Sequence, residues 1–510
     1  RKRVKMSTSH DFSVNTRQSK VAILLLIWKF YKLAFRQFLA LIALLAVGIS
    51  KSSMIALWGL FIAISVLVIV MALLSYYRFY FRIEDDELWI QKGVFKKSNI
   101  NIPFSRIQTV NFEQNILLQI FQNVKVEIDT AGSSKKEFSF DALEQPVANE
   151  LRQIILERKK IQAPVAVDDD SEKEALEWEE LEDSENHTIF QLSGGQLLKI
   201  GLTENHLRAG LWMIAVAGYL FSTANEVGFK VEDRIKDLEV FEQFNPGLIY
   251  ALSFIPALIL ILILVSIVRT YLRYYGLSFD RLTNGFKIYS GLINRKEFSA
   301  PDNKIQKVAW GDNPLRRIFG IFVLWLKQAR SADSDRNRSM SIPIITEDYI
   351  QQTLRHLYGD EMDKPSFEYP TSKHFFYRNL IYFIGIPTAI ICTAGVYFKL
   401  YIILAIGVIC FLYFSITTYI QYRKSRFLFN DFMVLRKKGI YGNYREIIPW
   451  YKVQAVDIVQ GIYQRRYSLA NLILHTAAGE MKIPYLDLGQ AQKLRDYALF
   501  HAETSDKEWM

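Results

Sequence analysis

Long apolar runs alternate along the chain with stretches in which apolar and polar positions interchange. Four runs lack any charged residue over a length that crosses a bilayer at about 1.5 Å per residue; they are residues 54–74, 246–268, 380–398 and 400–422. Weaker apolar runs at 37–50 and 209–225 each precede a strong one. The pattern predicts six transmembrane helices arranged as three hairpins.

The stretches after the hairpins predict small β domains. In the first of them, residues 78–83, 87–92 and 123–130 are rich in β-branched and aromatic side chains and are separated by Gly- or Asp-containing turns. A helical spacing of apolar residues follows the last predicted strand in each stretch. These residues are Val147, Leu151, Ile154 and Ile155, then Ile350, Leu354 and Leu357 after a capping Thr346, and finally Leu494, Ala498 and His501. We therefore expect an antiparallel sheet closed by a C-terminal helix.

One residue pattern recurs in three copies without a gap. Pro103 and Pro301 are separated by 198 residues, and Pro301 and Pro449 by 148. The same two spacings align five further columns, which are Phe81, Phe279 and Phe427; Gly93, Gly291 and Gly439; Ile107, Ile305 and Val453; Gln108, Gln306 and Gln454; and Val110, Val308 and Val456. Agreement of six columns in three copies indicates an internal repeat of one membrane hairpin and one β domain.

The Pro-x-x-[Lys/Arg]-[Ile/Val]-Gln core behind a membrane hairpin resembles the bacterial membrane-flanked PH-like domain family. The resemblance covers nearly the whole chain, with further matches at residues 16–19 and 198–206. It implies a PH-like fold of two packed sheets and one helix. The three-copy form is similar to the long member of a two-protein set whose shorter partner carries one copy. The second copy has Asp302 and Asn303 in place of an aromatic pair and an enlarged last hairpin at 331–339, so a ligand common to all three copies does not follow.

The expected fold class is an α+β multidomain membrane protein with three pairs of transmembrane helices, each followed by a PH-like β domain with a C-terminal helix. The expected segments are a basic N-terminal segment (1–36), hairpin 1 (37–75), PH-like domain 1 (76–161), an acidic linker (162–190), hairpin 2 with an acidic outer loop (191–270), PH-like domain 2 (271–360), hairpin 3 (361–422) and PH-like domain 3 (423–505). Lys29, Lys32 and Arg36 share one helical face, so residues 21–36 form either an interfacial helix or an extension of the first span.

Charge is distributed unevenly. The chain has a net charge of +10, and residues 168–185 hold eleven acidic residues and one Lys, which leaves +20 on the rest. Lys and Arg flank the predicted spans on the side of the β domains, whereas the loop 226–242 holds six acidic and three basic residues. Because cytoplasmic flanks are rich in Lys and Arg, we expect the β domains and both termini on the cytoplasmic face of a bacterial inner membrane.

Few residues suggest catalytic or metal chemistry. The seven His do not share metal-ligand spacing, and no phosphate loop or nucleophile elbow is present. Cys392 and Cys410 both lie in predicted spans, where a zinc site or a disulfide framework is not expected. We therefore expect no enzyme activity, no cofactor and no nucleic-acid partner.

The remaining candidates are contact residues and structural residues. Arg316, Arg317, Arg465 and Arg466 are the candidate lipid or partner contacts, with solvated turn residues as the alternative. Basic residues beside the inner leaflet attract anionic lipid by about 1 kcal/mol each when well placed. The repeat-core residues Pro103, Gln108, Pro301, Gln306, Pro449 and Gln454 are predicted to be structural. Each glutamine is expected to bond backbone groups across the bend after the proline.

Two functions remain after these exclusions. The first is a non-enzymatic scaffold that presents the β domains to partner proteins, including a shorter single-repeat membrane protein, or to membrane lipid. The alternative is a component of export of, or resistance to, an amphipathic compound such as an antimicrobial peptide. Export needs a polar or roomy path between the hairpins, while a scaffold can pack them closely.

Overall fold

The computed structural model describes residues 10–46, 51–130, 138–162, 187–204, 246–329, 340–363 and 366–505. The chain divides into two compact units. Unit 1 contains the described residues up to Thr188 and the segment Asp280–Pro301. Unit 2 contains those of Ile189–Phe279, Asp302–Ala329 and Arg338–Met510.

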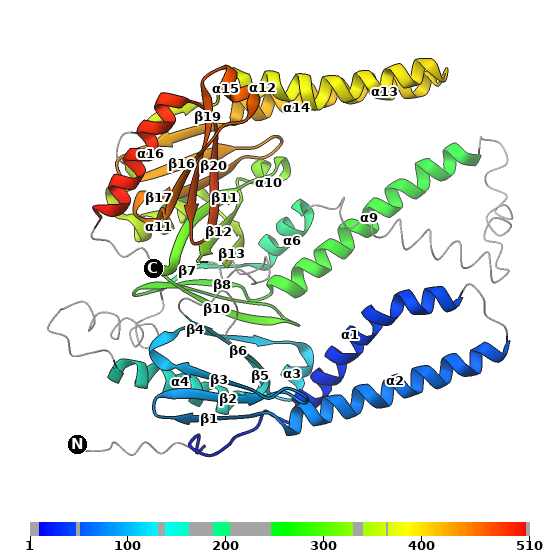
Figure 1. Ribbon diagram of the computed structural model, residues 1–510, viewed down its shortest axis with the longest axis vertical. Helices are drawn as coiled ribbons and strands as arrows, with labels where there is room; N and C mark the ends of the chain where they lie inside the picture. Colours follow the sequence, from blue (N-terminus) through cyan, green and yellow to red (C-terminus); the bar gives the residue numbers. More distant parts are fainter. Residues whose placement is uncertain are drawn as a thin grey trace. The chain divides into compact units, whose positions relative to one another are not determined.

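Unit 1 begins with two long helices and continues with a β region (Figure 1). Its elements are α1 (Val21–Ala46), α2 (Lys51–Tyr77), β1 (Tyr80–Glu84), β2 (Glu87–Lys92), β3 (Ser98–Pro103), η1 (Phe104–Arg106), β4 (Ile107–Gln114), α3 (Ile116–Ile120), β5 (Asn123–Thr130), β6 (Phe138–Glu144) and α4 (Gln145–Gln162), followed later in the chain by β8 (Ser278–Leu282), β9 (Gly285–Ser290) and β10 (Arg295–Pro301). Strands β1-β2-β3 form one sheet, and β6-β5-β4-β10-β9-β8 follow one another in a second. A strand of the second repeat thus extends a sheet of the first.

Unit 2 contains the rest of the second repeat and the whole third repeat. Its elements are β7 (His187–Gln191), α6 (Gly194–Thr203), α9 (Pro246–Tyr274), η3 (Asp302–Lys304), β11 (Ile305–Gly311), α10 (Pro314–Ile318), β12 (Phe322–Gln328), β13 (Met340–Ile345), α11 (Glu347–Tyr358), η4 (Gly359–Asp363), β14 (Phe367–Pro370), α12 (Lys373–Arg378), the π-helical η5 (Asn379–Gly385), α13 (Ile386–Tyr397), α14 (Tyr401–Lys424), β15 (Arg426–Phe429), β16 (Met433–Lys438), β17 (Tyr444–Pro449), η6 (Trp450–Lys452), β18 (Ala455–Val459), α15 (Ile462–Arg466), β19 (Leu469–Thr476), β20 (Gly479–Asp487) and α16 (Leu488–Glu503). One sheet has the order β13-β12-β11-β17-β16-β15-β14 and another the order β18-β19-β20.

We call the antiparallel pairing of β4 with β10 the first junction and that of β11 with β17 the second junction. Each junction joins the second-half strands of one repeat to the first-half strands of the next. The sequence predicted three separate β domains and gave no indication of these shared sheets. Sheet extension of this kind satisfies the backbone groups of strands that would otherwise be edges.

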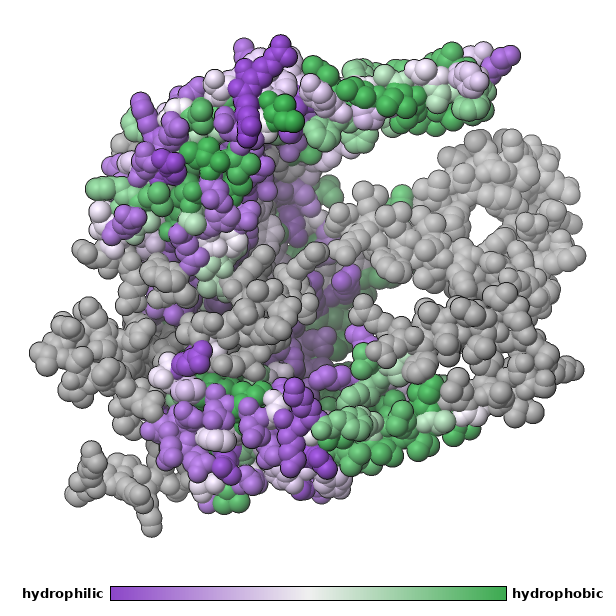
Figure 2. All heavy atoms as spheres, viewed as in Figure 1, coloured by the Kyte–Doolittle hydropathy of each residue, from purple (hydrophilic) through white to green (hydrophobic). Residues whose placement is uncertain are grey.

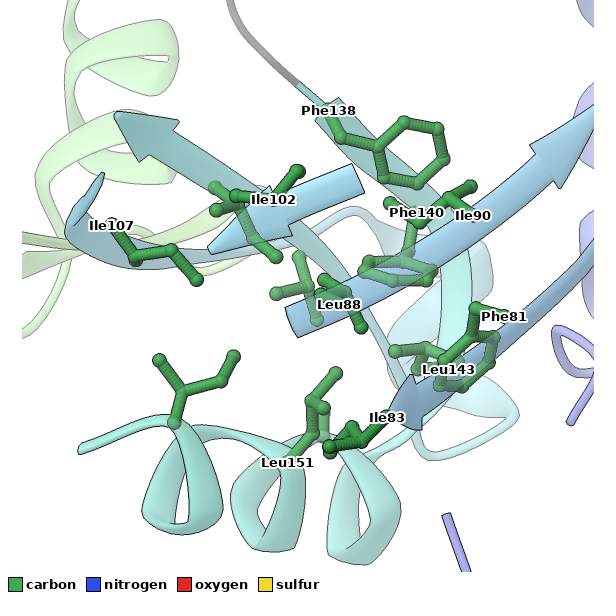
Figure 3. Packing of buried hydrophobic residues seen from close by; sticks show 14 of the residues in the cluster. Phe81, Ile83, Leu88, Ile90, Ile102, Ile107, Phe138, Phe140, Leu143 and Leu151 are labelled. Carbon is green, nitrogen blue, oxygen red and sulfur yellow. The ribbon is translucent and has the colours of Figure 1, made fainter. Parts of the chain in front are cut away.

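The predicted β and helical segments are confirmed within each repeat. The strands expected at 78–83, 87–92 and 123–130 are β1, β2 and β5, and the three expected helices are α4, α11 and α16. Thr346 occupies the N-cap position of α11, although its side chain makes no capping hydrogen bond. In the first repeat the two sheets and α4 enclose a core that includes Phe81, Leu88, Phe140 and Leu151 (Figure 3).

Two columns of the repeat, the proline and the glycine, have a backbone explanation. The proline at the repeated position ends a strand in each copy and precedes a 3-10 turn, which is η1, η3 or η6. The aligned glycines have φ values of +113°, +109° and +152°, and a Cβ at any of them would approach a carbonyl oxygen to about 2 Å; they are Gly93, Gly291 and Gly439. Only glycine tolerates such a backbone without strain.

Among the described residues, fewer helices are long and apolar enough to cross a membrane than the six that the sequence predicted. Lys373–Tyr397, which joins α12, η5 and α13, and α14 are long and apolar enough to cross a membrane, and Phe61–Tyr77 is a shorter apolar helix. The visible surface of α13 and α14 is mostly apolar (Figure 2). Residues 21–36 and the start of the first weak run belong to one continuous helix, α1. The expected span at 209–225, the acidic linker 168–185 and the loop 226–242 lie outside the described residues.

Candidate functional site

A short helix follows the first strand of each second half at the same repeat position. These helices are α3, α10 and α15, whose first residues are 198 and then 148 residues apart. Each presents a bare apolar side chain, since Ile120, Ile318 and Ile462 are 67%, 77% and 92% exposed. Each is followed by a residue with a left-handed backbone, which reverses the chain into the next strand; they are Gln122, Gly320 and Ser468.

Each short helix adjoins one of the helices expected to lie in or near the membrane. Leu118 of α3 belongs to an apolar cluster with residues of α1 and α2. Asn313, which caps α10, donates from Nδ2 to the carbonyl oxygen of Thr203 at the end of α6, over 2.8 Å. The Tyr463 hydroxyl of α15 lies 3.2 Å from Nδ1 of His374 in α12. Each short helix therefore carries an exposed isoleucine and contacts one of these helices through another residue.

The structure separates the four candidate arginines into different environments. Arg465 and Arg466 lie on α15 and are exposed. Arg317 is also accessible, but it makes a two-pronged ion pair with Asp312, with Nη2–Oδ1 at 2.8 Å and Nε–Oδ2 at 3.2 Å. Arg316 is only 7% exposed, and its Nη1 donates to the carbonyl oxygen of Pro343 over 2.8 Å. Arg316 is therefore a buried structural residue, which corrects its assignment as a surface contact.

Gln119 of α3, Arg317 of α10 and Arg465 of α15 occupy the same repeat position, which we call the arginine column. At both junctions this position is linked to the adjoining repeat. Its Nε2 donates to the carbonyl oxygens of Leu292 and Ile293, over 3.2 and 2.7 Å, in the turn before β10. Arg317 acts through Asp312, whose Oδ1 accepts a 2.7 Å hydrogen bond from the backbone of Asn443 in the turn before β17. This position thus lies beside the incoming turn at both junctions, in direct contact at the first and through Asp312 at the second.

For the repeated glutamines the structure describes the backbone, and the expected side-chain hydrogen bonds of Gln108 and Gln306 stay a prediction. Gln108 and Gln306 occupy β-bulges, because the pairing register shifts between their two neighbours in β4 and β11. Gln306 is fully buried. Gln454 is exposed, and its backbone N–H, rather than its side chain, donates to the carbonyl oxygen of His475 over 2.8 Å. A bulge inserts one residue into a strand and bends it, which is a geometric reason for the fixed column.

The second junction contains a buried carboxylate that sequence reasoning missed. Glu446 of β17 is 2% exposed; it pairs with Arg436 on the neighbouring strand and with Lys327 Nζ of β12 at 3.0 Å. Burial alone would raise the pKa of Glu446, but Arg436, Lys327 and the buried Lys307 together hold it below its ordinary value. The Lys327–Glu446 pair joins a strand of the second repeat to a strand of the third.

The first junction also carries ion pairs. Glu113 of β4 binds Lys296 of β10 at 2.8 Å and Lys125 of β5 at 3.2 Å. Burial favours a higher pKa for Glu113, but the two lysines lower it below the ordinary value. Glu297 of β10 binds Arg152 of α4, with Nη1–Oε1 at 3.0 Å. Both junctions are thus stabilised by charge pairs as well as by strand pairing.

Comparison with known proteins identifies the domain type. The bacterial PH domain profile matches residues 23–159, 237–361 and 381–499. The UPF0699 transmembrane protein YdbT of Bacillus subtilis (strain 168) is 26% identical over 291 residues, which are 56% of this chain and 57% of that protein. The UPF0699 transmembrane protein YdbS of the same strain is 36% identical over 72 residues, which are 14% of this chain and 45% of that protein. The chain spans about half the length of these curated relatives, and no solved structure matches it significantly. Because the three matched regions cover most of the sequence and coincide with the three repeats, the chain belongs to the bacterial PH domain family.

Proposed function

We propose that this protein is a non-enzymatic scaffold of the bacterial inner membrane that holds three PH-like domains against the inner leaflet. The observation that carries the proposal is the short helix α3, α10 or α15 in each repeat, which has an exposed isoleucine and contacts a helix of the adjoining predicted hairpin region. An apolar side chain surrounded by polar groups at this place suits the lipid headgroup region. Anionic lipid would supply the counter-charge for Arg465 and Arg466.

The two helices of the third hairpin pack closely against each other, as a scaffold allows. A Cβ added at Gly407 of α14 would lie 2.9 Å from Sγ of Cys392 in α13. A Cβ at Gly395 would lie 3.4 Å from the backbone nitrogen of Leu404. Helices that approach so closely at small residues leave no room for a solute inside this hairpin.

The finer topology is part of the proposal. Six spans in three hairpins would place all three PH-like domains and both termini in the cytoplasm, as the charge distribution predicts. A cysteine in place of Asp233 should then react with an impermeant thiol reagent in intact cells, and a cysteine in place of Asp457 should not. The reverse labelling pattern would place the domains outside and end the proposal.

A fluorescence experiment tests contact with the leaflet. Single cysteines at Ile318 and Ile462, in a full-length protein with Cys392 and Cys410 replaced by Ala, are labelled with a polarity-sensitive dye. In nanodiscs their emission should shift to the blue relative to the detergent-free aqueous dye, and more so with anionic than with neutral lipid. The control cysteine at Lys493, on the exposed side of α16, should show no lipid dependence. Emission at Ile318 and Ile462 that matches this control would contradict the proposal.

The proposed partner class is protein as well as lipid. A shorter membrane protein with a single PH-like repeat is the partner that the repeat architecture favours, because each junction already shows one repeat binding the next.

A further inference from the structure

The two junctions use one and the same strand register. In the first, Glu113 lies opposite Lys296. In the second, Gly311 lies opposite Tyr444. Gly311 follows Glu113 by 198 residues and Tyr444 follows Lys296 by 148, which are the two repeat spacings. A register that recurs in two sequence-divergent junctions is a property of the repeat and not of one pair of strands.

In the third repeat, no strand among the described residues pairs with the edge that is covered at the two junctions. β18 is the counterpart of β4 and β11, yet it lies at the edge of the sheet β18-β19-β20. All residues of β11 are buried at its junction, whereas Asp457 and Val459 of β18 are exposed. Val459, the counterpart of Gly311, is 46% exposed. An open strand edge is a template for pairing with another chain.

The C-terminal helices show which charge the missing strand should carry. Val124, Phe322 and Ala470 share a repeat column, and they pair with Leu143, Ile345 and Leu486. The helix begins two residues later in every repeat, so the eighth helical residue is Arg152 in α4, Leu354 in α11 and Arg495 in α16. Arg152 binds Glu297 of the docked strand. Arg495 stands at the place of Arg152, with 41% of its side chain exposed, and its partner in the structure is the adjacent, exposed Asp496 at 2.8 Å. A carboxylate at the Glu297 position of an incoming strand would meet Arg495 and share it with Asp496.

The chain's own open strand is a poor occupant for this site. β3 is the counterpart of β10 and β17 and is the edge of the sheet β1-β2-β3. It has Asn99 at the position of Glu297, so it offers no charge to Arg495. The turn before it carries Lys96 and Lys97. They would approach the position of Arg465, where Gln119 contacts the incoming turn directly in the first junction and Arg317 pairs with Asp312, which contacts it, in the second. Like charges at this place disfavour a second copy of the chain.

We propose that the free edge of β18 docks an antiparallel edge strand from a PH-like domain on a different polypeptide, one that places a carboxylate opposite Arg495. This inference rests on the scaffold function proposed above and names the surface through which the scaffold holds its protein partner. The partner residue opposite Val459 is the counterpart of Ser98 and Lys296. A domain with a single PH-like repeat has such a strand at its edge, as β3 shows in the first repeat.

Disulfide crosslinking between two differently tagged full-length chains tests the site. The bait carries Val459→Cys, and the probe carries Ser98→Cys, both with Cys392 and Cys410 replaced by Ala. One probe keeps the native β3 turn. The other probe reproduces the expected partner through Lys96→Gly, Lys97→Asn and Asn99→Glu. We expect the altered probe to crosslink to the bait at least tenfold more than the native probe in detergent.

Two bait variants make the outcome specific. Arg495→Glu in the bait should remove most of the gain of the altered probe, because the new carboxylate then meets a like charge. A bait cysteine at Lys493 in place of Val459 sets the background.

Each remaining outcome is decisive. If both probes crosslink to Val459→Cys no more than to the Lys493→Cys bait, the docking site is overturned. Equal and strong crosslinking of both probes would show that β18 accepts a second copy of this chain, which would overturn the assignment to a different polypeptide. Neither outcome affects the dye experiment on Ile318 and Ile462, so a failure of the docking site is distinguishable from a failure of the membrane scaffold.

Discussion

Replacement of Glu446 by Gln is the sharpest test of how the repeats are joined. Glutamine keeps the shape of the side chain but removes the charge that Arg436 and Lys327 share, while Lys307 remains buried nearby. Breaking one partner of a buried ion pair costs about 3–5 kcal/mol. At about 1.4 kcal/mol per factor of ten, local opening of the second junction should increase by about a hundred- to a few thousand-fold.

Hydrogen–deuterium exchange with mass spectrometry measures this opening in the full-length protein. Peptides that cover 305–311 and 444–449 should exchange faster by that factor, whereas peptides from β19 and β20 should keep their protection. A matched control is Arg445→Gln, which removes a partly exposed pair with Glu347 at 3.0 Å. Such pairs contribute about 1 kcal/mol or less, so this variant should change exchange by fivefold at most.

A second substitution distinguishes lost charge balance from lost packing. Lys327→Met in the Glu446→Gln background removes one of the cations left without its carboxylate, so part of the protection should return. Unchanged exchange in Glu446→Gln would refute the view that the buried carboxylate holds the junction. Accelerated exchange that Lys327→Met makes worse would show that packing, and not charge, is responsible.

Three further predictions concern pH, backbone and membrane charge. The pKa values of the junction carboxylates, including Glu446, are lowered in the fold. The stability that these carboxylates contribute should therefore be complete above about pH 4.3, the ordinary pKa of Glu, and should be lost as the pH falls through the lowered values. Hydrogen exchange at the junctions, measured as a function of pH, checks this. Gly439→Ala should destabilise the third repeat by more than about 1 kcal/mol, because the φ of Gly439 is +152° and the new Cβ would meet a carbonyl oxygen at 2.0 Å. The control is Gly194→Ala, whose Cβ would enter open space, and thermal unfolding of both variants in detergent compares them. Arg465→Gln with Arg466→Gln should weaken the anionic-lipid preference of the dye at Ile462, and most clearly at low salt because the Debye length is about 8 Å at physiological ionic strength; an unchanged preference would remove these two arginines from the contact.

Much of each repeat was predictable because local rules govern it. Strands β1, β2 and β5 follow from runs of β-branched and aromatic residues, and α4 and α16 follow from apolar spacing. The glycine column marks a turn that needs positive φ, and the proline column marks the end of a strand. These signals act over a few residues, so a sequence pattern records them directly.

The candidate site was predictable only in part. The sequence placed Arg465 and Arg466 on a turn near the membrane side, and α15 does contact the third hairpin. It also placed Arg316 there, although the fold buries that side chain. The exposed Ile318 and Ile462 were missed, yet an apolar residue in a short segment between two strands was a usable signal. Exposure depends on which elements pack around a residue, and that is decided at a distance.

The sequence by itself determined the threefold repeat and the order of strands and helix inside each copy, and it predicted the membrane hairpins. Only the tertiary structure decided which strand lies beside which across repeats. β4 and β10 are separated by some 180 residues of chain, and no periodicity within a strand specifies its neighbour over such a distance. The choice depends on shape and charge at the sheet edges, such as Glu446 among its cations and Arg152 on Glu297, which come together only when both edges have formed. β18 is an open edge of its sheet, because no strand among the described residues pairs with its outer side.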